Sequence, residues 1–388
     1  MSKNVIIGAG LSGRGYLNRL LYLSKEETVF LDHDDHLIQQ LRHNPSYTIR
    51  FGNEREPLIV DNYTAYTITD ERAITAIERS DRIFISVGAD HVAELLPFLQ
   101  AALKQRARRS LDILVAENGI QPSSPLAVLR SDPRIHLSEA VIFCTTLGQR
   151  DSLDIFSENL DHLPYDSIAL GHALPLYGFV QETHFSDLLE RKIYTYNCIS
   201  ACIAYLGYEK GYTDYAEAAN DDEISGKIER IADVINRCIT AVYKVSLQEQ
   251  REFSKMAIQK FQNRNIIDTV ARNVRDVERK LKPEERIRKP LSLMQEQGEY
   301  SRELLEVLAA ALKSFRRIGK SWWSCTHRGC AKRGSRWCIA AVNDIAIRYP
   351  LSLWRLSVHY SEGLKRNRVF MPLLASAYKK TEKEEIKS

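Results

Sequence analysis

The feature that most constrains the fold is a glycine-rich stretch near the start of the chain, NVIIGAGLSGRGY at residues 4–16. Residues 4–7 are an apolar run, and from Tyr16 onward apolar residues follow helical spacing, so the glycines lie in a turn between a strand and a helix. In a G-x-G-x-x-G turn, the first glycine permits the sharp bend, the second lets a pyrophosphate approach the backbone, and the third allows close helix–strand packing. Amide N–H groups at the helix N-terminus then donate hydrogen bonds to the pyrophosphate. The turn therefore predicts a dinucleotide site formed by Gly8, Ala9, Gly10, Leu11, Ser12, Gly13, Arg14 and Gly15.

An acidic residue at the end of the next apolar run belongs to the same pattern. Residues 28–31 form that run, and Asp32 follows it, about 20 residues beyond the turn. A carboxylate at this place accepts the ribose hydroxyls of NAD and repels the additional phosphate of NADP. We therefore expect NAD as the cofactor, with Val87 and Gly88, at the end of a further predicted strand, as additional contacts.

Strand and helix patterns alternate through the first half of the chain. Apolar runs at 82–87, 112–116 and 140–143 are candidates for buried strands, with helix-like segments at 92–103 and 123–129 between them. This alternation favours an α/β fold with a doubly wound, Rossmann-type parallel sheet. Residues 46–68 differ, because their alternation around Gly52 and Asn53 predicts a β-hairpin insert. From about residue 187 the patterns indicate a mainly α-helical domain, most clearly at 187–206, 223–245, 247–261 and 300–313.

The length and the distribution of charge predict the domain organisation. A chain of 388 residues exceeds the usual size of one core, so we expect more than one domain. The predicted division is an NAD-binding domain at 1–186, a helical substrate and catalytic domain at 187–313, and a basic tail at 314–388. The tail holds 16 Lys and Arg against 5 Asp and Glu, a net charge of +11 against −7 for the remainder, and all four tryptophans.

Three interpretations are open for the tail. Cys325, His327, Cys330 and Cys338 superficially suggest a metal site, but their spacing fits no zinc motif. Interleaved Trp and Arg residues suit nucleic-acid binding. We favour the third interpretation, a frameshifted or unrelated extension with little ordered structure, and we expect no nucleic-acid partner.

The cysteine content and the lengths of the apolar runs bear on where in the cell the protein is located. Seven cysteines, an odd number without disulfide spacing, predict reduced thiols in a cytoplasmic protein. No apolar stretch approaches the roughly 20 residues of a membrane span, and the N-terminus lacks a signal-peptide core, so we expect no membrane association. The oligomeric state stays open.

The helical half offers a proton acceptor in the stretch ERKIYTYNCIS at 190–200. A lysine in a closed pocket has a lowered pKa and can act as a general base, and amide N–H groups stabilise a developing alkoxide. On an α-helix, Lys192 and Asn197 lie about 140° apart and do not share a face. Asn197 and Ser200, three residues apart, do share one.

Several segments combine with this stretch into a more specific pattern: GAGLSGRG at 8–15, VAENG at 115–119, ERKIYTYN at 190–197, AYLG at 204–207, KFQN at 260–263, and RKL with ERIRKPL at 279–291. With these motifs in this order and spacing, residues 1–313 resemble the polyol-specific long-chain dehydrogenases. The resemblance implies a metal-independent, NAD-linked oxidation of a secondary alcohol, with the active site between the Rossmann domain and the helical domain. It also implies that Lys192 is the general base, and that Asn197 and Asn118 hold the substrate oxygen.

The chain departs from the family pattern at two places. Ser200 stands where the family has a histidine, and Ile142 and Phe143 stand where an Asp-Arg pair usually follows the sixth strand. A serine can hydrogen-bond a substrate hydroxyl but cannot hold a charge. In the basic run at 264–289, Arg272 and Lys289 fall in matching family segments and are our candidates for binding a phosphate or carboxylate, with a solvated, ion-paired helix face as the alternative.

Together these residues favour an NAD-dependent oxidoreductase that interconverts a linear polyol phosphate and its ketose phosphate, with no metal in the reaction. The compact length up to residue 313 suits the sugar-phosphate branch of the family. Two alternatives stay open: a sugar acid of the fructuronate or tagaturonate type as the substrate, and a catalytically silent NAD-binding protein.

Overall fold

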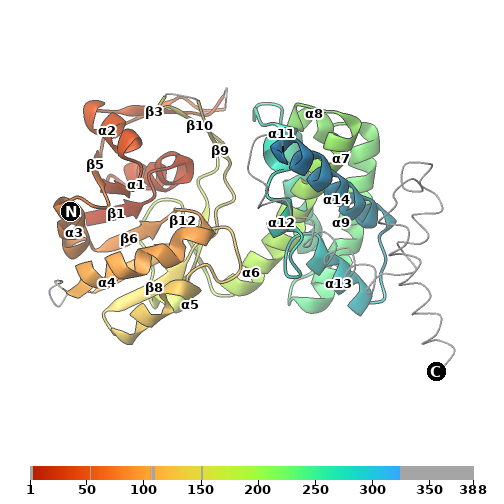
Figure 1. Ribbon diagram of the computed structural model, residues 1–388. Coiled ribbons are helices and arrows are strands. Elements are labelled where there is room, and N and C mark those ends of the chain that lie inside the picture. Colours follow the sequence, from red (N-terminus) through yellow and green to blue (C-terminus); the bar gives the residue numbers. More distant parts are fainter. Residues whose placement is uncertain (1–2, 53, 105, 107–109, 150–151, 324–388) are drawn as a thin grey trace. The chain divides into compact units, whose positions relative to one another are not determined.

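The computed structural model describes residues 3–52, 54–104, 106, 110–149 and 152–323 (Figure 1). Contacts within the chain divide it into two units, one that ends at Glu190 and one that begins at Arg191. Of the predicted tail at 314–388, residues 324–388 lie outside the described residues. None of the helices in the part of the chain that is described has the length and apolar character needed to cross a membrane.

The first unit is built on a six-stranded sheet in which every pair of neighbouring strands is parallel. Its strands lie in the order β5-β2-β1-β6-β7-β8. Because β1 lies between β2 and β6, the order of the strands reverses at β1, and in such sheets ligands bind outside the carboxyl ends of the strands at this switch point. The strands are β1 (Lys3–Ile7), β2 (Glu27–Asp32), β5 (Tyr63–Thr67), β6 (Arg82–Ile85), β7 (Leu111–Val115) and β8 (Ile135–Glu139).

Helices cover both faces of this sheet, because alternate strand residues point to opposite sides. Ile6 of β1 packs in one core with residues of η1 (Gly13–Leu17), α1 (Asn18–Leu23) and α2 (Asp35–His43). Val5 and Ile7 pack in a second core, with α3 (Glu71–Arg79), η2 (Ala89–Leu95), α4 (Leu96–Lys104) and η3 (Ser124–Ser131). The predicted doubly wound α/β fold is therefore confirmed.

A second, four-stranded sheet in the order β4-β3-β10-β9 packs against the first core. Its strands are β3 (Tyr47–Arg50), β4 (Leu58–Val60), β9 (Thr146–Gly148) and β10 (Ile155–Ser157). The antiparallel pair β3–β4 is the predicted hairpin, but the insert does not extend to residue 68. Residues 63–67 form β5, which pairs in parallel with β2. This edge strand is only partly buried, so its alternating pattern resembled that of a hairpin arm.

The segment before the second unit also differs from expectation. The predicted strand at 140–143 is wrong, because β8 ends at Glu139 and only Ala140 continues, in an isolated bridge to Tyr165. A short parallel pair, β11 (Leu163–Asp166) and β12 (Phe179–Glu182), flanks the helix α5 (Ser167–Leu170).

The second unit is mainly helical, as expected (Figure 1). The buried helix α7 packs against α8, α11 and α14. Helix α14 continues past residue 313, the predicted end of the helical domain, to Trp323, so residues 314–323 of the predicted tail are helical. The helical segments are α6 (Phe185–Lys192), η4 (Ile193–Asn197), α7 (Cys198–Lys210), α8 (Tyr215–Ala219), α9 (Asp222–Val242), α10 (Leu247–Gln262), α11 (Val270–Asn273), α12 (Val277–Lys280), α13 (Arg288–Glu296) and α14 (Arg302–Trp323).

Candidate active site

The glycine turn after β1 has the geometry that a bound pyrophosphate needs. Gly8 has a φ of +101°, and a Cβ on it would lie 2.1 Å from the carbonyl oxygen of Ser86. A Cβ on Gly13 would lie 2.0 Å from the carbonyl oxygen of Gly8. By contrast, no atom lies within 4 Å of a Cβ placed on Gly10. The fold therefore requires the first and third glycines, whereas Gly10 leaves the backbone open for a ligand, as a dinucleotide turn demands.

Three neighbouring residues of the predicted set lie between these glycines. Ala9 is fully buried. Leu11 is 37% exposed, and Ser12 is half-buried and makes no side-chain capping bond to the following helix. Leu11 and Ser12 are therefore the members of the turn whose side chains reach the surface next to Gly10.

Arg14 and Gly15 shape the turn from the protein side. The guanidinium of Arg14 is buried, where Nε donates to the Ala9 carbonyl at 2.7 Å and Nη1 donates to the Leu153 carbonyl at 2.9 Å. Burial lowers the pKa of Arg14. A Cβ on Gly15 would lie 2.6 Å from Cγ2 of Ile155 in β10, so glycine lets the helix approach the second sheet. Both residues support the cofactor turn rather than extend a side chain toward it.

Asp32 connects the end of β2 to the glycine turn. Its Oδ2 accepts a hydrogen bond from the Ala9 amide at 2.7 Å, and its Oδ1 accepts one from the Asp34 amide at 3.0 Å. The exposed imidazole of His33 lies 3.2 Å from Oδ1. The carboxylate thus holds the turn in shape and lies at the strand end where NAD-binding folds bind the ribose hydroxyls.

A second loop with a positive φ follows β6. Val87 is half-buried, and Gly88 has a φ of +91°. The Gly88 amide donates to Oε1 of Glu117 at 2.6 Å, so this carboxyl group connects the ends of β6 and β7. Burial raises the pKa of Glu117, and backbone hydrogen bonds from Gly88, Val87 and Asn118 oppose the rise. The next residue, Asn118, is exposed at the same sheet edge. The role of Glu117 in positioning this loop was not predicted, because its contact with Gly88 joins residues that are distant in the sequence.

In the second unit, Lys192 is the last residue of α6 and is 4% exposed. Its pKa is lowered to about 7, first because burial penalises the ammonium form and then because the positive charges of Lys260 and Arg286 repel it. With this pKa, amine and ammonium are both populated at neutral pH. That is the property of a group that takes up and returns a proton.

A π-helical turn, η4, follows Lys192 directly. Because a π-turn closes hydrogen bonds between residues i and i+5, it brings Lys192 and Asn197 to nearly the same side. The expectation that these two residues do not share a face assumed an α-helix and is wrong. Asn197 and Ser200 are half-buried while the two residues between them are buried, so these two side chains share a face as expected. Short π-turns of this kind are frequent at functional sites.

Ser200 has a defined hydrogen-bond partner. The hydroxyl of Tyr215 donates to the carbonyl oxygen and to Oγ of Ser200, each at 3.0 Å. Burial raises the pKa of Tyr215, which keeps it a donor at neutral pH. A serine hydroxyl both accepts and donates, so Ser200 can accept this bond and still donate one of its own.

A buried polar network holds the π-turn in place. Gln250 of α10 is fully buried and donates from Nε2 to Oγ1 of Thr195 at 2.9 Å and to Oδ1 of Asn236 at 3.3 Å. Its Oε1 accepts a hydrogen bond from Nε of Arg191 at 3.1 Å. No local sequence pattern indicates this network, because single polar residues on amphipathic helices are usually on the solvated face.

The two predicted anion contacts are already paired with carboxylates. Nη1 of Arg272 donates to Oδ2 of Asp268 at 2.7 Å, and Nζ of Lys289 lies 3.1 Å from Oε2 of Glu284. Both basic residues are also partly exposed. These contacts correspond to the ion-paired surface that we considered as the alternative.

A second buried lysine shares the lowered pKa of Lys192 but not its surroundings. Lys280 is 8% exposed, and its pKa is lowered to about 7 by burial and by the charges of Arg286 and Arg279. Its Nζ donates to the carbonyl oxygen of Asn273 at 2.5 Å. This bond connects α12 to α11, which gives Lys280 a structural role.

Both halves of the chain match models of one protein family. Residues 2–147 match the mannitol dehydrogenase Rossmann domain, and residues 184–318 match the mannitol dehydrogenase C-terminal domain. The mannitol-1-phosphate 5-dehydrogenase of Arthrobacter sp. (strain FB24) is 28% identical over 329 residues, which cover 80% of this chain and 86% of that protein. The protein of the same name from Clostridium acetobutylicum is 29% identical and covers 75% of this chain and 81% of its own length.

Solved structures support the same fold. The Pseudomonas fluorescens mannitol 2-dehydrogenase, in a ternary complex with NAD and D-mannitol, matches with a TM-score of 0.66 at 12% identity, over 81% of this chain and 79% of that chain. A substrate-free D-sorbitol dehydrogenase matches with a TM-score of 0.61 at 12% identity, over 81% and 80% of the two chains.

Proposed function

The chain belongs to the mannitol dehydrogenase family, and on that premise we propose that it is an NAD-dependent oxidoreductase that interconverts a linear polyol phosphate, of the mannitol 1-phosphate kind, and its ketose phosphate. The names of its curated relatives support the substrate class. One observation carries the activity: the buried Lys192, with a pKa of about 7, directly precedes a π-turn that brings Asn197 to its side.

The residues of the first unit fit a dinucleotide. The backbone at Gly10 is open, while Gly8 and Gly13 hold the chain in the bend that exposes it. Asp32, at the end of β2, binds the ribose hydroxyls and gives the preference for NAD. When bound, NAD⁺ supplies the acceptor for the hydride that leaves the carbinol carbon.

Lys192 exchanges a proton with the substrate. In the oxidation direction its neutral amine takes the proton of the substrate hydroxyl, and in the reduction direction its ammonium returns it. The side-chain amide of Asn197 donates a hydrogen bond to the substrate oxygen, where negative charge develops. For Asn118 the same role rests on the resemblance of the VAENG segment to the family. The Ser200 hydroxyl donates to a further substrate hydroxyl.

The charges around Lys192 also suit a phosphorylated substrate. Lys260 and Arg286 are close enough to lower the pKa of Lys192, so they place positive charge beside the reacting group. We therefore favour Arg286 and Lys260 as the residues that attract the phosphate, because their charges act on Lys192. Arg286 is paired with Glu285 at 3.0 Å, as Arg272 and Lys289 are with their own carboxylates, so nearness to Lys192 is what sets it apart.

A substrate screen with the full chain tests this function. NADH formation from NAD⁺ is measured with mannitol 1-phosphate, other hexitol phosphates and free hexitols, and NADH consumption is measured with hexuronates, with Lys192→Met as the inactive control. Turnover of a hexitol phosphate by the wild type and not by the variant is the expected result. Activity with hexuronates alone establishes the sugar-acid alternative. Tight NAD binding without turnover of any of these compounds establishes a silent binding protein.

A further inference from the structure

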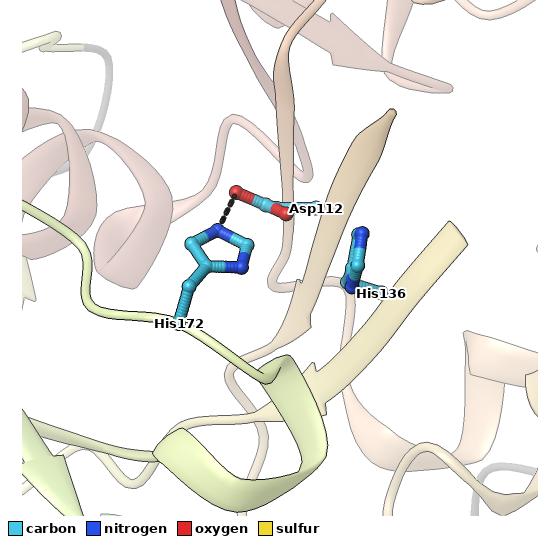
Figure 2. A group of neighbouring side chains, drawn as sticks. All are labelled: Asp112, His136 and His172. Atoms are coloured by element: carbon cyan, nitrogen blue, oxygen red, sulfur yellow. Dashed lines mark hydrogen bonds and ion pairs between the residues drawn. The ribbon is translucent and has the colours of Figure 1, made fainter. Parts of the chain in front are cut away.

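The amino-terminal edge of the six-stranded sheet carries a side-chain cluster that the proposed function does not use. Asp112 on β7, His136 on β8 and His172 in the segment after α5 point toward one another (Figure 2). We propose that these three side chains bind a divalent transition-metal ion of the Zn²⁺ type.

The sheet register brings two of the ligands together. Asp112 and His136 are directly paired residues of the parallel strands β7 and β8. Residues at equal height on neighbouring strands can place side chains on the same face within reach of one ion. Asp112 is 8% exposed and His136 is half-buried, so the carboxylate lies at the closed end of the cluster.

The third ligand comes from a segment that is fixed against β8. Oγ of Ser138 donates to the carbonyl of Asp166 at 2.7 Å, which ties the start of α5 to that strand. Gly171 ends α5 with a φ of +83°, and a Cβ on it would lie 4.0 Å from Nδ1 of His136. His172 therefore follows a turn that faces His136.

The distances are close to those of a coordinated ion. Nε2 of His172 lies 3.0 Å from Oδ2 of Asp112, and one ligand atom from each of the three residues lies within 4.8 Å of the others. Zn²⁺ bonds of about 2.0–2.2 Å place tetrahedral ligand atoms roughly 3.4 Å apart. Small side-chain rotations are enough to close the remaining gap to His136.

The donor set selects the class of ion. Two imidazoles and one carboxylate suit Zn²⁺ and its neighbours in the transition series, whereas Mg²⁺ and Ca²⁺ prefer oxygen ligands. The imidazole of His172 is 44% exposed, so the site opens to solvent and water can complete the coordination. The cluster lies at the sheet edge opposite the glycine turn, so the ion ties β7, β8 and the segment after α5 together rather than taking part in hydride transfer.

An ordinary ion pair in the same unit provides the comparison. His91 lies 3.2 Å from Oε1 of Glu94 on the exposed η2, a distance similar to that between His172 and Asp112. Within the described residues, however, the group formed by Asp112, His136 and His172 is the one set of three His, Cys, Asp or Glu side chains that converge in this way. The third side chain is what distinguishes a metal site from a pair.

The test uses the full chain after removal of metal with a chelator. Zn²⁺ binding is followed by calorimetry and by the shift in melting temperature, because an ion that binds only the folded state stabilises it. His172→Ala and His136→Ala should each weaken one Zn²⁺ site at least about tenfold and remove its thermal shift. His91→Ala, the matched control, should bind Zn²⁺ as the wild type does. Because the His172 side chain is 44% exposed, its variant is expected to fold.

Cobalt distinguishes this site from any site made by cysteines. Co²⁺ bound by two imidazoles and a carboxylate gives visible ligand-field bands without the near-ultraviolet charge-transfer absorption of thiolate ligands. Those bands should be lost in His172→Ala and retained in His91→Ala. Unchanged Zn²⁺ affinity in both cluster variants, or a Co²⁺ spectrum with thiolate absorption that His172→Ala leaves intact, would overturn the proposal. Neither readout depends on dehydrogenase activity.

Discussion

Lys192→Met removes the amine from its buried position while keeping an unbranched side chain of similar length. In the wild type the pKa of Lys192 is lowered from 10.5 to about 7. Because oxidation uses the amine form, kcat/KM for the polyol phosphate should rise about tenfold per pH unit up to about pH 7 and then level off. Reduction uses the ammonium and should decline above the same pH. A positioned general base contributes about 10²–10⁴-fold, so the variant should lose about that factor in kcat and lose the titration in both directions.

The same shift predicts an effect on stability with a definite sign. The pKa of Lys192 is lower in the folded state, so between about pH 7 and 10.5 the unfolded chain binds more protons than the folded one. The free energy of unfolding should therefore gain a contribution from Lys192 as the pH rises through this window, on the order of a few kcal/mol. Lys192→Met should lack that contribution and be more stable than the wild type near pH 7. Urea denaturation at several pH values measures it.

Lys280→Met is the matched control, because Lys280 is also buried and its pKa is also about 7. Its Nζ is hydrogen-bonded to the Asn273 carbonyl, so its loss should leave the pH profile of kcat/KM in place. Steady-state rates of NADH formation and consumption between pH 5.5 and 9, chosen to bracket about pH 7, compare the three proteins. If Lys192→Met keeps the wild-type profile, or if Lys280→Met alone abolishes it, the assignment of the base is refuted.

Three further substitutions test the supporting contacts. Gly10→Val should raise the dissociation constant for NAD at least about tenfold, or about 1.4 kcal/mol, and leave the melting temperature unchanged. Gly8→Ala should instead destabilise the fold by about 1–3 kcal/mol through strain at its positive φ. Calorimetry measures the loss of NAD binding, and thermal unfolding measures the loss of stability. Asp32→Ala should lower the ratio of kcat/KM for NAD over NADP, and an unchanged ratio would contradict the role of its carboxylate. Gln250→Leu leaves buried Arg191 without one acceptor and should lower the free energy of unfolding by about 1–3 kcal/mol, measured with urea; equal stability would show that the network is dispensable.

The fold could be predicted to the extent that local patterns determine it. The turn at Gly8, Gly10 and Gly13 requires a strand before it and a helix after it, and this fixed the Rossmann class from few residues. The edge strand β5 was misassigned because its alternating burial is also typical of a hairpin. The strand β8 was placed too late, because His136 and Ser138 interrupt its apolar pattern. Pairing with β7, a tertiary contact, makes that segment a strand.

The residues of the candidate site also divide into those that a local sequence pattern identifies and those that only the tertiary structure identifies. Lys192 and Asn197 were found from a motif, but their relation depends on a π-turn that α-helical periodicity cannot reveal. Glu117 and Gln250 act through contacts with residues distant in sequence, so no local spacing identifies them. The same is true of Asp112 and His172, which lie 60 residues apart in the chain and 3.0 Å apart in the structure.

Transfer of deuterium tests the central claim most directly. The enzyme is incubated with NAD⁺ and a hexitol phosphate that carries deuterium on its reacting secondary carbon, and the reduced cofactor is analysed by mass spectrometry and NMR. Direct hydride transfer predicts that the label moves to C4 of the nicotinamide ring. Release of the label into water, or conversion of the polyol phosphate without reduction of NAD⁺, would contradict the account.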